Sequence, residues 1–154
     1  MVKNVTLAMP IAGKPIALSE VNDYLFNKKM LGEGVAINPS DNFIYSPCDG
    51  EIVVVYDTRH AIVIESDDGL KILIHVGIDS VKLEGRSFAS YVKVGDRVKV
   101  GEKLLFFDRD FVERKISPIT PIVITNPEVI DCIDINYRAT KVGETVIKLT
   151  LKVQ

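Results

Sequence analysis

Short apolar stretches, each bounded by glycine, proline, asparagine or aspartate, recur along the whole chain. Valine and isoleucine dominate these stretches, and several alternate with polar residues at the period of two that a half-buried strand requires. The pattern predicts strands at residues 4–8, 35–39, 50–58, 61–66, 70–78, 80–85, 103–108, 122–125 and 144–153, and a turn and strand pair within residues 94–101. Many short strands separated by turn residues indicate an all-β fold, an antiparallel β-sandwich or barrel with little helix.

Helix signals are few and short. Each begins with a serine, aspartate or asparagine, whose side-chain oxygen is able to cap backbone N–H groups at a helix start. These signals predict short helical segments within residues 19–30, 110–115 and 128–133, with Ser19, Asp110 and Asn126 as the N-caps. Prolines and glycines predict irregular connections at residues 10–15 and 42–47.

Composition narrows the class of protein. A chain of 154 residues, 47% hydrophobic and 26% charged, is expected to form a single domain over residues 1–154. A net charge of −2 gives no electrostatic case for nucleic-acid binding. The apolar runs fall short of the ~18 residues of a membrane span, and no apolar signal-peptide core opens the chain. Together with Cys48 and Cys132, expected to be free thiols in a reducing compartment, these features predict a cytoplasmic protein.

Only two histidines are present, and both lie beside one predicted hairpin turn, at residues 66–69. A two-residue loop at 67–68 places His60 directly opposite His75, and a loop at 68–69 places His60 on the same face, two residues along. Opposed Cβ atoms lie ~5 Å apart and diagonal ones ~7 Å, so an even-length loop brings the two rings into contact. An odd-length loop sends the rings to opposite faces of the sheet.

A pair of neutral imidazoles suits phosphoryl chemistry, because a neutral ring nitrogen is a nucleophile near pH ~7. One ring takes the phosphoryl group on its free nitrogen, and the other stabilises the transferring oxygens. The remaining ring nitrogens need partners, for which Thr58 near His60 and a backbone carbonyl near Gly77 for His75 are the candidates. The alternative is that His75 is only a buried polar residue in an aliphatic strand.

Several spaced motifs carry a family resemblance. The most specific is residues 74–88, IHVGIDSVKLEGRSF, and the segment Thr58-Arg59-His60-Ala61 precedes it. Three further segments, SPCDGEIVVV, VGDRVKVG and TPIVITN, occur in the same order. From about residue 9 onward the chain resembles the IIA component of the glucose family of the bacterial phosphoenolpyruvate-dependent sugar phosphotransferase system. That family folds as an antiparallel β-sandwich with little helix.

The resemblance implies a phosphotransferase role without a cofactor, in which the two histidines differ. His75 would accept the phosphoryl group on Nε2 from the phosphocarrier protein HPr and pass it to a cysteine of the permease IIB domain. His60 would stabilise the phosphate, Thr58 would orient His60, and Asp79 would lie near the site. The implied docking face for HPr and IIB comprises Asp23, Leu25, Phe26, Met30, Leu31, Ile62 and Val76. Asp23 and Asp79 would meet cationic side chains of HPr.

The resemblance also implies a monomer that reaches the membrane only through its permease. Certain relatives carry a longer N-terminal tail that attaches to membranes, whereas this chain starts almost at its first strand. No metal is required, although His60 and His75 together form a possible adventitious zinc site.

Two alternative functions start from other features. A zinc hydrolase would use both histidines, but a catalytic zinc needs three protein ligands, and Asp79 is the nearest third candidate. The spacing of turns in residues 92–107, VKVGDRVKVGEKLLFF, is similar to that of biotinyl and lipoyl carrier domains. Such a carrier needs a lysine that is modified at a hairpin tip, and the predicted tip at residues 66–69 has none.

Overall fold

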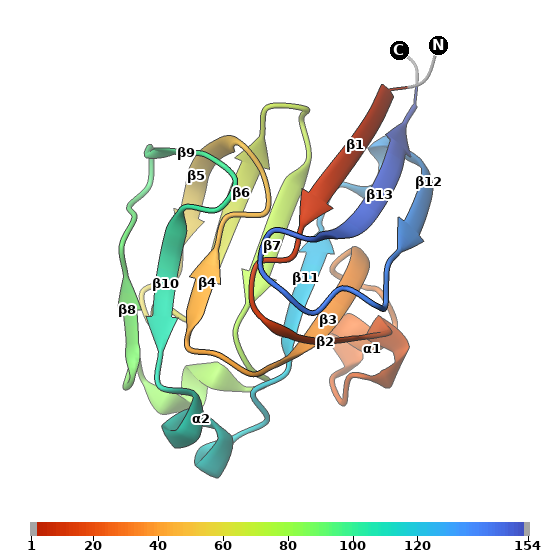
Figure 1. Cartoon of the computed structure of the whole chain (residues 1–154). Helices are drawn as coiled ribbons and strands as arrows, with labels where there is room; N and C mark the ends of the chain where they lie inside the picture. Colours follow the sequence, from red (N-terminus) through yellow and green to blue (C-terminus); the bar gives the residue numbers. More distant parts are fainter. Residues whose placement is uncertain (1–2, 153–154) are drawn as a thin grey trace.

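The computed structural model, which describes residues 3–152, is an antiparallel β-sandwich with little helix, as the sequence predicts (Figure 1). The strands are β1 (Lys3–Ala8), β2 (Gly13–Ile16), β3 (Glu33–Pro39), β4 (Phe43–Tyr45), β5 (Gly50–Val55), β6 (Ala61–Ser66), β7 (Lys71–His75), β8 (Phe88–Ser90), β9 (Arg97–Val98), β10 (Lys103–Phe107), β11 (Thr120–Ile124), β12 (Ile130–Ile135) and β13 (Thr145–Leu151). The helical turns are η1 (Leu18–Glu20), α1 (Tyr24–Asn27), η2 (Ser80–Leu83), α2 (Arg109–Lys115) and η3 (Pro127–Val129).

Three sheets make up the sandwich. The largest has seven strands in the order β2-β3-β11-β7-β6-β5-β9, and two three-stranded sheets have the orders β4-β10-β8 and β1-β13-β12. The interior strand β11 reads TPIVI and is buried at every position, because a strand covered on both faces needs a continuous apolar run rather than alternation. Among residues 3–152, no helix has the length and hydropathy that crossing a membrane would require.

The two faces of the seven-stranded sheet bury different cores. Ile62 and Ile74 face the larger core, which also takes in residues of both smaller sheets such as Leu105 and Leu149. Each such side chain contributes about 1.5–3 kcal/mol by leaving water. The opposite face carries a smaller core, in which Leu73 packs with residues of η1 and α1. This smaller core fixes α1 against the sheet next to the end of β7.

The short helices begin at residues other than the predicted ones. Asp23, not Ser19, is the N-cap of α1, and its carboxylate accepts a hydrogen bond from the Leu25 N–H at 2.8 Å. Asp108, not Asp110, is the N-cap of α2, and its carboxylate accepts from the Phe111 N–H. In both cases the sequence offers two acidic or hydroxyl residues within a few positions, and the backbone geometry selects one.

Four further expectations were wrong. Residues 80–85, predicted as a strand, begin with the 3₁₀ turn η2, and residues 128–133, predicted as a helix, lie mostly in β12. The Asn-Pro helix start serves only η3, because pairing with β13 takes over from residue 130. The connections predicted at 10–15 and 42–47 contain β2 and β4. Pro15 is tolerated in β2 because this strand lies at the sheet edge.

The β6–β7 hairpin has a register different from either predicted one. Ala61 pairs with His75 and Glu65 with Lys71, so the loop between Ser66 and Leu70 has three residues. Gly69 has φ +90°, the left-handed conformation that closes such a loop after a tight turn. The even-length loop on which the sequence argument depended was therefore wrong.

Candidate functional site

His75 is the last residue of β7, and its ring is held by the turn that follows. Its Nδ1 lies 2.8 Å from the carbonyl oxygen of Gly77, and since a carbonyl only accepts, Nδ1 carries the proton and donates it. Gly77 has φ +81°, which an L side chain rarely adopts. The half-buried ring of His75 therefore keeps its Nε2 lone pair free.

His60 lies in the bend that leads into β6. The preceding residue, Arg59, has φ +59°, so the chain is not extended at this point. The ring of His60 is only 3% exposed, its Nδ1 lies 2.5 Å from Thr58 Oγ1, and the ring of Tyr56 packs edge-on against it at 5.3 Å. The predicted contact of Thr58 with His60 is thus present in the structure.

The two imidazoles meet edge-to-face, with ring centroids 4.7 Å apart and an interplanar angle of 78°. The predicted closeness is confirmed although the predicted register was wrong. The ring of His75 packs on Phe26, from the smaller core, and the ring of His60 on Phe88, from the larger core. The rings therefore approach from the two faces of the sheet and meet beyond the end of the hairpin, where His60 has left the strand conformation.

Burial keeps both rings neutral. It lowers the pKa of His60 to about 4, and the neighbouring His75 lowers it further in the same direction. Burial also lowers the pKa of His75, opposed by the Gly77 carbonyl and by the charges of Asp23 and Asp79. Near neutral pH the site therefore presents an unprotonated Nε2 on His75, which is the form that attacks phosphorus.

Two carboxylates flank His75 on different elements. Asp23 caps α1, while Asp79 is exposed and lies 3.6 Å from the ammonium of Lys82. Asp79 itself adopts φ +61° in the turn between β7 and η2. Both carboxylates act electrostatically on the His75 ring, so the structure brings the two predicted residues to the same site.

The predicted docking face is only partly a surface. Leu25 and Met30 are exposed, at 46% and 66%, and Leu31 is half-buried. Phe26, Ile62 and Val76 are buried, at 3%, 0% and 0% exposure, and their side chains belong to the two cores, so their contact with a partner stays a prediction. Ile62 and Val76 lie in or next to β6 and β7, whose consecutive apolar residues are mostly buried because both faces of the sheet are covered.

Some residues around the site were not found by sequence reasoning. Phe88 and Tyr56 flank His60, and Tyr24 and Val81 are the exposed apolar side chains of α1 and η2, at 73% and 62%. The signal for Tyr56 lay in its position, four residues before His60 and directly after a strand. Phe88 closes the motif at residues 74–88, but its contact with His60 was not predicted, because that contact depends on how the η2 segment folds back.

The alternative functions lack their key residues. Within residues 3–152, no three histidine, cysteine, aspartate or glutamate side chains are arranged to hold a metal ion, which leaves a hydrolytic zinc without its third ligand. The tip of the β6–β7 hairpin consists of Asp67, Asp68 and Gly69, so it offers a carrier domain no lysine.

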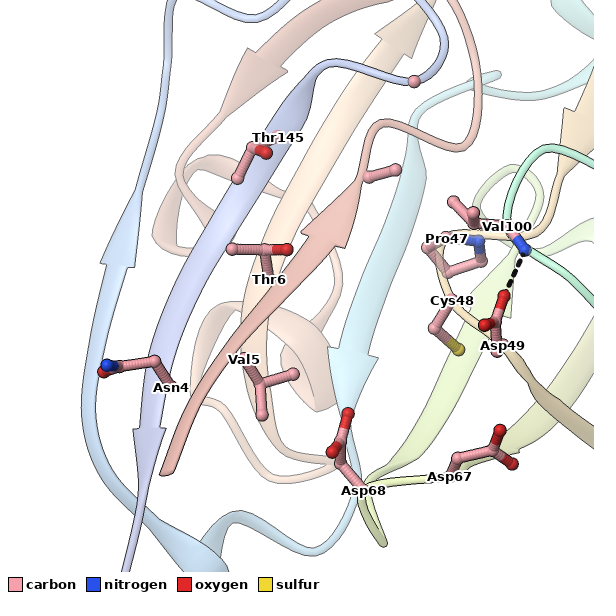
Figure 2. Close-up of a pocket in the computed structure, with 12 residues that line it drawn as sticks. Asn4, Val5, Thr6, Pro47, Cys48, Asp49, Asp67, Asp68, Val100 and Thr145 are labelled. Atoms are coloured by element: carbon pink, nitrogen blue, oxygen red, sulfur yellow. Dashed lines mark hydrogen bonds between the residues drawn. The ribbon is translucent and has the colours of Figure 1, made fainter. Parts of the chain in front are cut away.

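The opposite end of the β6–β7 hairpin contains a cavity of about 440 Å³ (Figure 2). Cys48 lies in its wall among the carboxylates of Asp49, Asp67 and Asp68 (Figure 2). Burial, followed by these carboxylates, raises the pKa of the Cys48 thiol to about 12. Cys48 and the exposed Cys132 are both free, as the sequence predicts. An inert thiol among carboxylates offers no group for phosphoryl transfer, so the histidine pair remains the candidate site.

The fold and site together define a class: an antiparallel β-sandwich that presents two neutral, hydrogen-bonded imidazoles at one end of its largest sheet. The family model of the phosphoenolpyruvate-dependent sugar phosphotransferase system, EIIA 1, matches residues 5–130, and the chain belongs to this family. It is accordingly a phosphotransferase component that relays phosphoryl groups in sugar uptake.

Individual relatives agree with this assignment. The chain is 49% identical to a glucose-specific EIIA component of Oceanobacillus iheyensis, over 82% of this chain and 77% of the relative. It is 43% identical to one of Bacillus cereus, over 96% and 91%. The glucose permease IIA of Mycoplasma capricolum superimposes with a TM-score of 0.90 at 36% identity, covering 95% of this chain and 96% of that one. A glucosamine-specific EIICBA component of Bacillus subtilis is 48% identical over 79% of this chain and 19% of the relative.

Proposed function

We propose that Nε2 of His75 is the atom that carries the phosphoryl group, with HPr as the donor and a cysteine of a permease IIB domain as the acceptor. The observation that carries this proposal is the hydrogen bond from His75 Nδ1 to the Gly77 carbonyl at 2.8 Å. It fixes the tautomer in which Nε2 is unprotonated, at the one half-buried ring nitrogen beside a second imidazole.

In the first transfer, the Nε2 lone pair of His75 forms a bond to phosphorus. The bond between phosphorus and the donor atom of HPr breaks, and its electron pair leaves with that atom. Because Nδ1 keeps its proton, the phosphorylated ring becomes more positive. The Gly77 carbonyl and the negative charges of Asp23 and Asp79 stabilise that added charge.

His60 stabilises the phosphoryl oxygens and does not carry the group. In this arrangement the Thr58 hydroxyl donates to Nδ1 of His60, so that the proton of the neutral ring sits on Nε2. An Nε2–H beside the Nε2 of His75 is placed to donate to an oxygen of the transferring group. The low pKa of His60, about 4, keeps the ring in this neutral form during transfer.

The second transfer reverses the first. The thiolate of a IIB cysteine attacks phosphorus, the phosphorus–nitrogen bond breaks, and the electron pair returns to Nε2 of His75. The relatives named EIICBA components, in which a segment similar to this chain forms part of a longer protein, support a IIB domain as the acceptor.

Docking uses the exposed apolar residues in and just after α1, together with the carboxylates beside His75. Leu25 and Met30 supply apolar contact, and Asp23 and Asp79 attract cationic side chains of HPr. A relay protein must release one partner before it meets the next, so the interface is expected to be small, under ~1,200 Å². The reaction takes place in the cytoplasm, and the chain meets the membrane only through the permease.

The test is phosphoryl transfer from labelled phosphoenolpyruvate through enzyme I and HPr, followed by mapping of the acid-labile phosphate. His75→Ala is expected to take no label, because the acceptor atom is absent. His60→Ala is expected to take label and to pass it to IIB at least about tenfold more slowly, since one transition-state donor is lost. Label on His75→Ala, or label mapped to another residue of the native chain, would overturn the proposal.

A further inference from the structure

One buried hydroxyl lies directly behind the turn that holds His75. Ser80, the first residue of η2, is fully buried at 0% exposure, and its Oγ donates a hydrogen bond to the carbonyl of Val76. We propose that Ser80 is a positioning residue, which sets the tautomer and orientation of the His75 ring through the backbone of residues 76–78. The catalytic consequence rests on the proposed role of His75 as phospho-acceptor; the effect on the tautomer does not.

The hydroxyl fixes the peptide that leads into Gly77. The N–H of Val76 donates to the carbonyl of His60 at 2.8 Å, and the carbonyl of Val76 accepts from Ser80. Both backbone polar groups of Val76 are therefore hydrogen-bonded, the N–H to His60 and the C=O to Ser80. Since that C=O belongs to the 76–77 peptide, Ser80 sets the plane of this peptide.

The next peptide carries the carbonyl that binds His75. Its oxygen, from Gly77, accepts from His75 Nδ1, and its N–H, from Ile78, donates to the carbonyl of Ser117 at 3.0 Å. Gly77 joins the two peptides, and glycine resists rotation less than any other residue. The hydrogen bonds on either side of Gly77 therefore hold its carbonyl in place, and Ser80 provides the one on the side of His75.

Packing couples the same two residues. A Cβ on Gly77 would lie 2.8 Å from Ser80 Oγ and 3.0 Å from Ile116 Cδ1. The hydroxyl therefore occupies the space against Gly77 as well as bonding to Val76. Removing it deletes a hydrogen bond to a buried carbonyl and opens room beside the glycine, so the 76–78 backbone gains freedom to turn its carbonyl away from His75.

The experiment compares Ser80→Ala with Ser46→Ala. Ser46 is a matched control: it is 1% exposed, and its hydroxyl donates to the Cys48 carbonyl at 2.6 Å in the β4–β5 connection. Nitrogen NMR of the imidazole rings in the unphosphorylated protein reports the tautomer of His75, and the initial rate of transfer from phosphorylated HPr reports function. Ser80→Ala is expected to mix the two tautomers and to lower the rate roughly tenfold to a hundredfold. Ser46→Ala is expected to change neither.

Further variants separate positioning from stability. Ser80→Thr keeps the hydroxyl and is expected to keep the native tautomer, whereas Ser80→Cys, of similar size but a weak donor, is expected to lose it even if Ser80→Ala does not fold. A native tautomer in both Ser80→Ala and Ser80→Cys would overturn the inference, and so would equal changes in the Ser80 and Ser46 variants. The two proposals can also fail separately. If the Ser80 variants shift the tautomer but the native protein takes no phosphate on His75, the positioning role stands and only the proposed function is rejected.

Discussion

At the scale of single residues, the site depends on two imidazoles kept neutral at different depths. His60 is buried and has a pKa of about 4, while His75 is half-buried and has a carbonyl and two carboxylates opposing the effect of burial. Under the proposed function, the buried ring donates a hydrogen bond in its neutral form. The half-buried ring is then the nucleophile, and the carbonyl and the two carboxylates stabilise its positive charge after it accepts phosphate. Unequal exposure and different neighbours are therefore the physical basis on which we propose unequal roles for the two rings.

This burial predicts a loss of stability in acid. An unfolded His60 takes up a proton near pH 6.5, whereas the folded residue takes it up only near pH 4. The unfolded state binds more protons between these values, so the free energy of unfolding falls as pH falls through this window. His60→Gln is expected to remove part of this fall, on the order of 1–2 kcal/mol after allowance for solvent screening. Denaturant unfolding near pH 7 and pH 4 measures it, and equal losses in both proteins would refute the assignment.

At the scale of elements, the sequence predicted most strands but neither the hairpin register nor the outcome of competing signals. Strands such as β6 and β13 were found because apolar periodicity reports burial directly. The hairpin register was missed because a Ser-Asp-Asp-Gly segment fits two- and three-residue loops equally well, and only pairing across the whole strand decides. The helix predicted at 128–133 was wrong because pairing with β13 outweighed a local start signal.

In the candidate site, contacts between residues close in sequence were predictable, and contacts that depend on the folded backbone were not. Thr58 and His60 are close in sequence, and a short spacing is enough to bring them together. The partner of His75 was predictable only as a carbonyl near Gly77. Phe88 reaches His60 through the fold of η2, and Ser80 reaches His75 through a backbone turn with two positive φ angles, so neither contact has a sequence pattern.

The segment formed by α1 and the turn that follows it gives a prediction about docking. Replacing Leu25 and Met30 together by serine removes exposed apolar contact and leaves the core intact, so stability is expected to stay within about 0.5 kcal/mol. The KM for phosphorylated HPr is expected to rise about tenfold, with little change in kcat, because a desolvated apolar anchor contributes ~1–2 kcal/mol. Steady-state transfer assays measure both constants.

Val100→Ser is the matched control for this prediction. Val100 is also exposed, at 52%, but it lines the cavity at the far end of the hairpin. Its replacement is expected to leave KM unchanged. A KM that rises equally in both variants, or in neither, would argue against residues 24–30 as a docking segment.

At the scale of the whole molecule, the two ends of the β6–β7 hairpin differ. One end carries the imidazole pair, and the other carries Cys48 and a group of carboxylates. At the histidine end, Arg59, Gly77 and Asp79 adopt left-handed backbone conformations. At the other end, Asp67 pairs with Arg97 at 2.7 Å and Asp68 with Lys3 at 2.7 Å. These pairs join the tip to β9 and β1, which lie in different sheets, so at this anchored end the hairpin is connected to both sheets by exposed ion pairs.

The anchored end makes the Cys48 thiol a probe of global opening. Its side chain belongs to the larger core and its pKa is about 12, so near neutral pH the native protein holds almost none of it as reactive thiolate. The exposed Cys132 is expected to react with a thiol reagent at least roughly a thousandfold faster, and Cys132→Ser is expected to abolish this fast phase. The slow phase should accelerate with urea along the slope of global unfolding, because unfolding removes the burial and the neighbouring carboxylates that keep the Cys48 thiol protonated. If the rate of the slow phase does not depend on urea, the β4–β5 connection opens by itself, and the far end of the hairpin is not anchored.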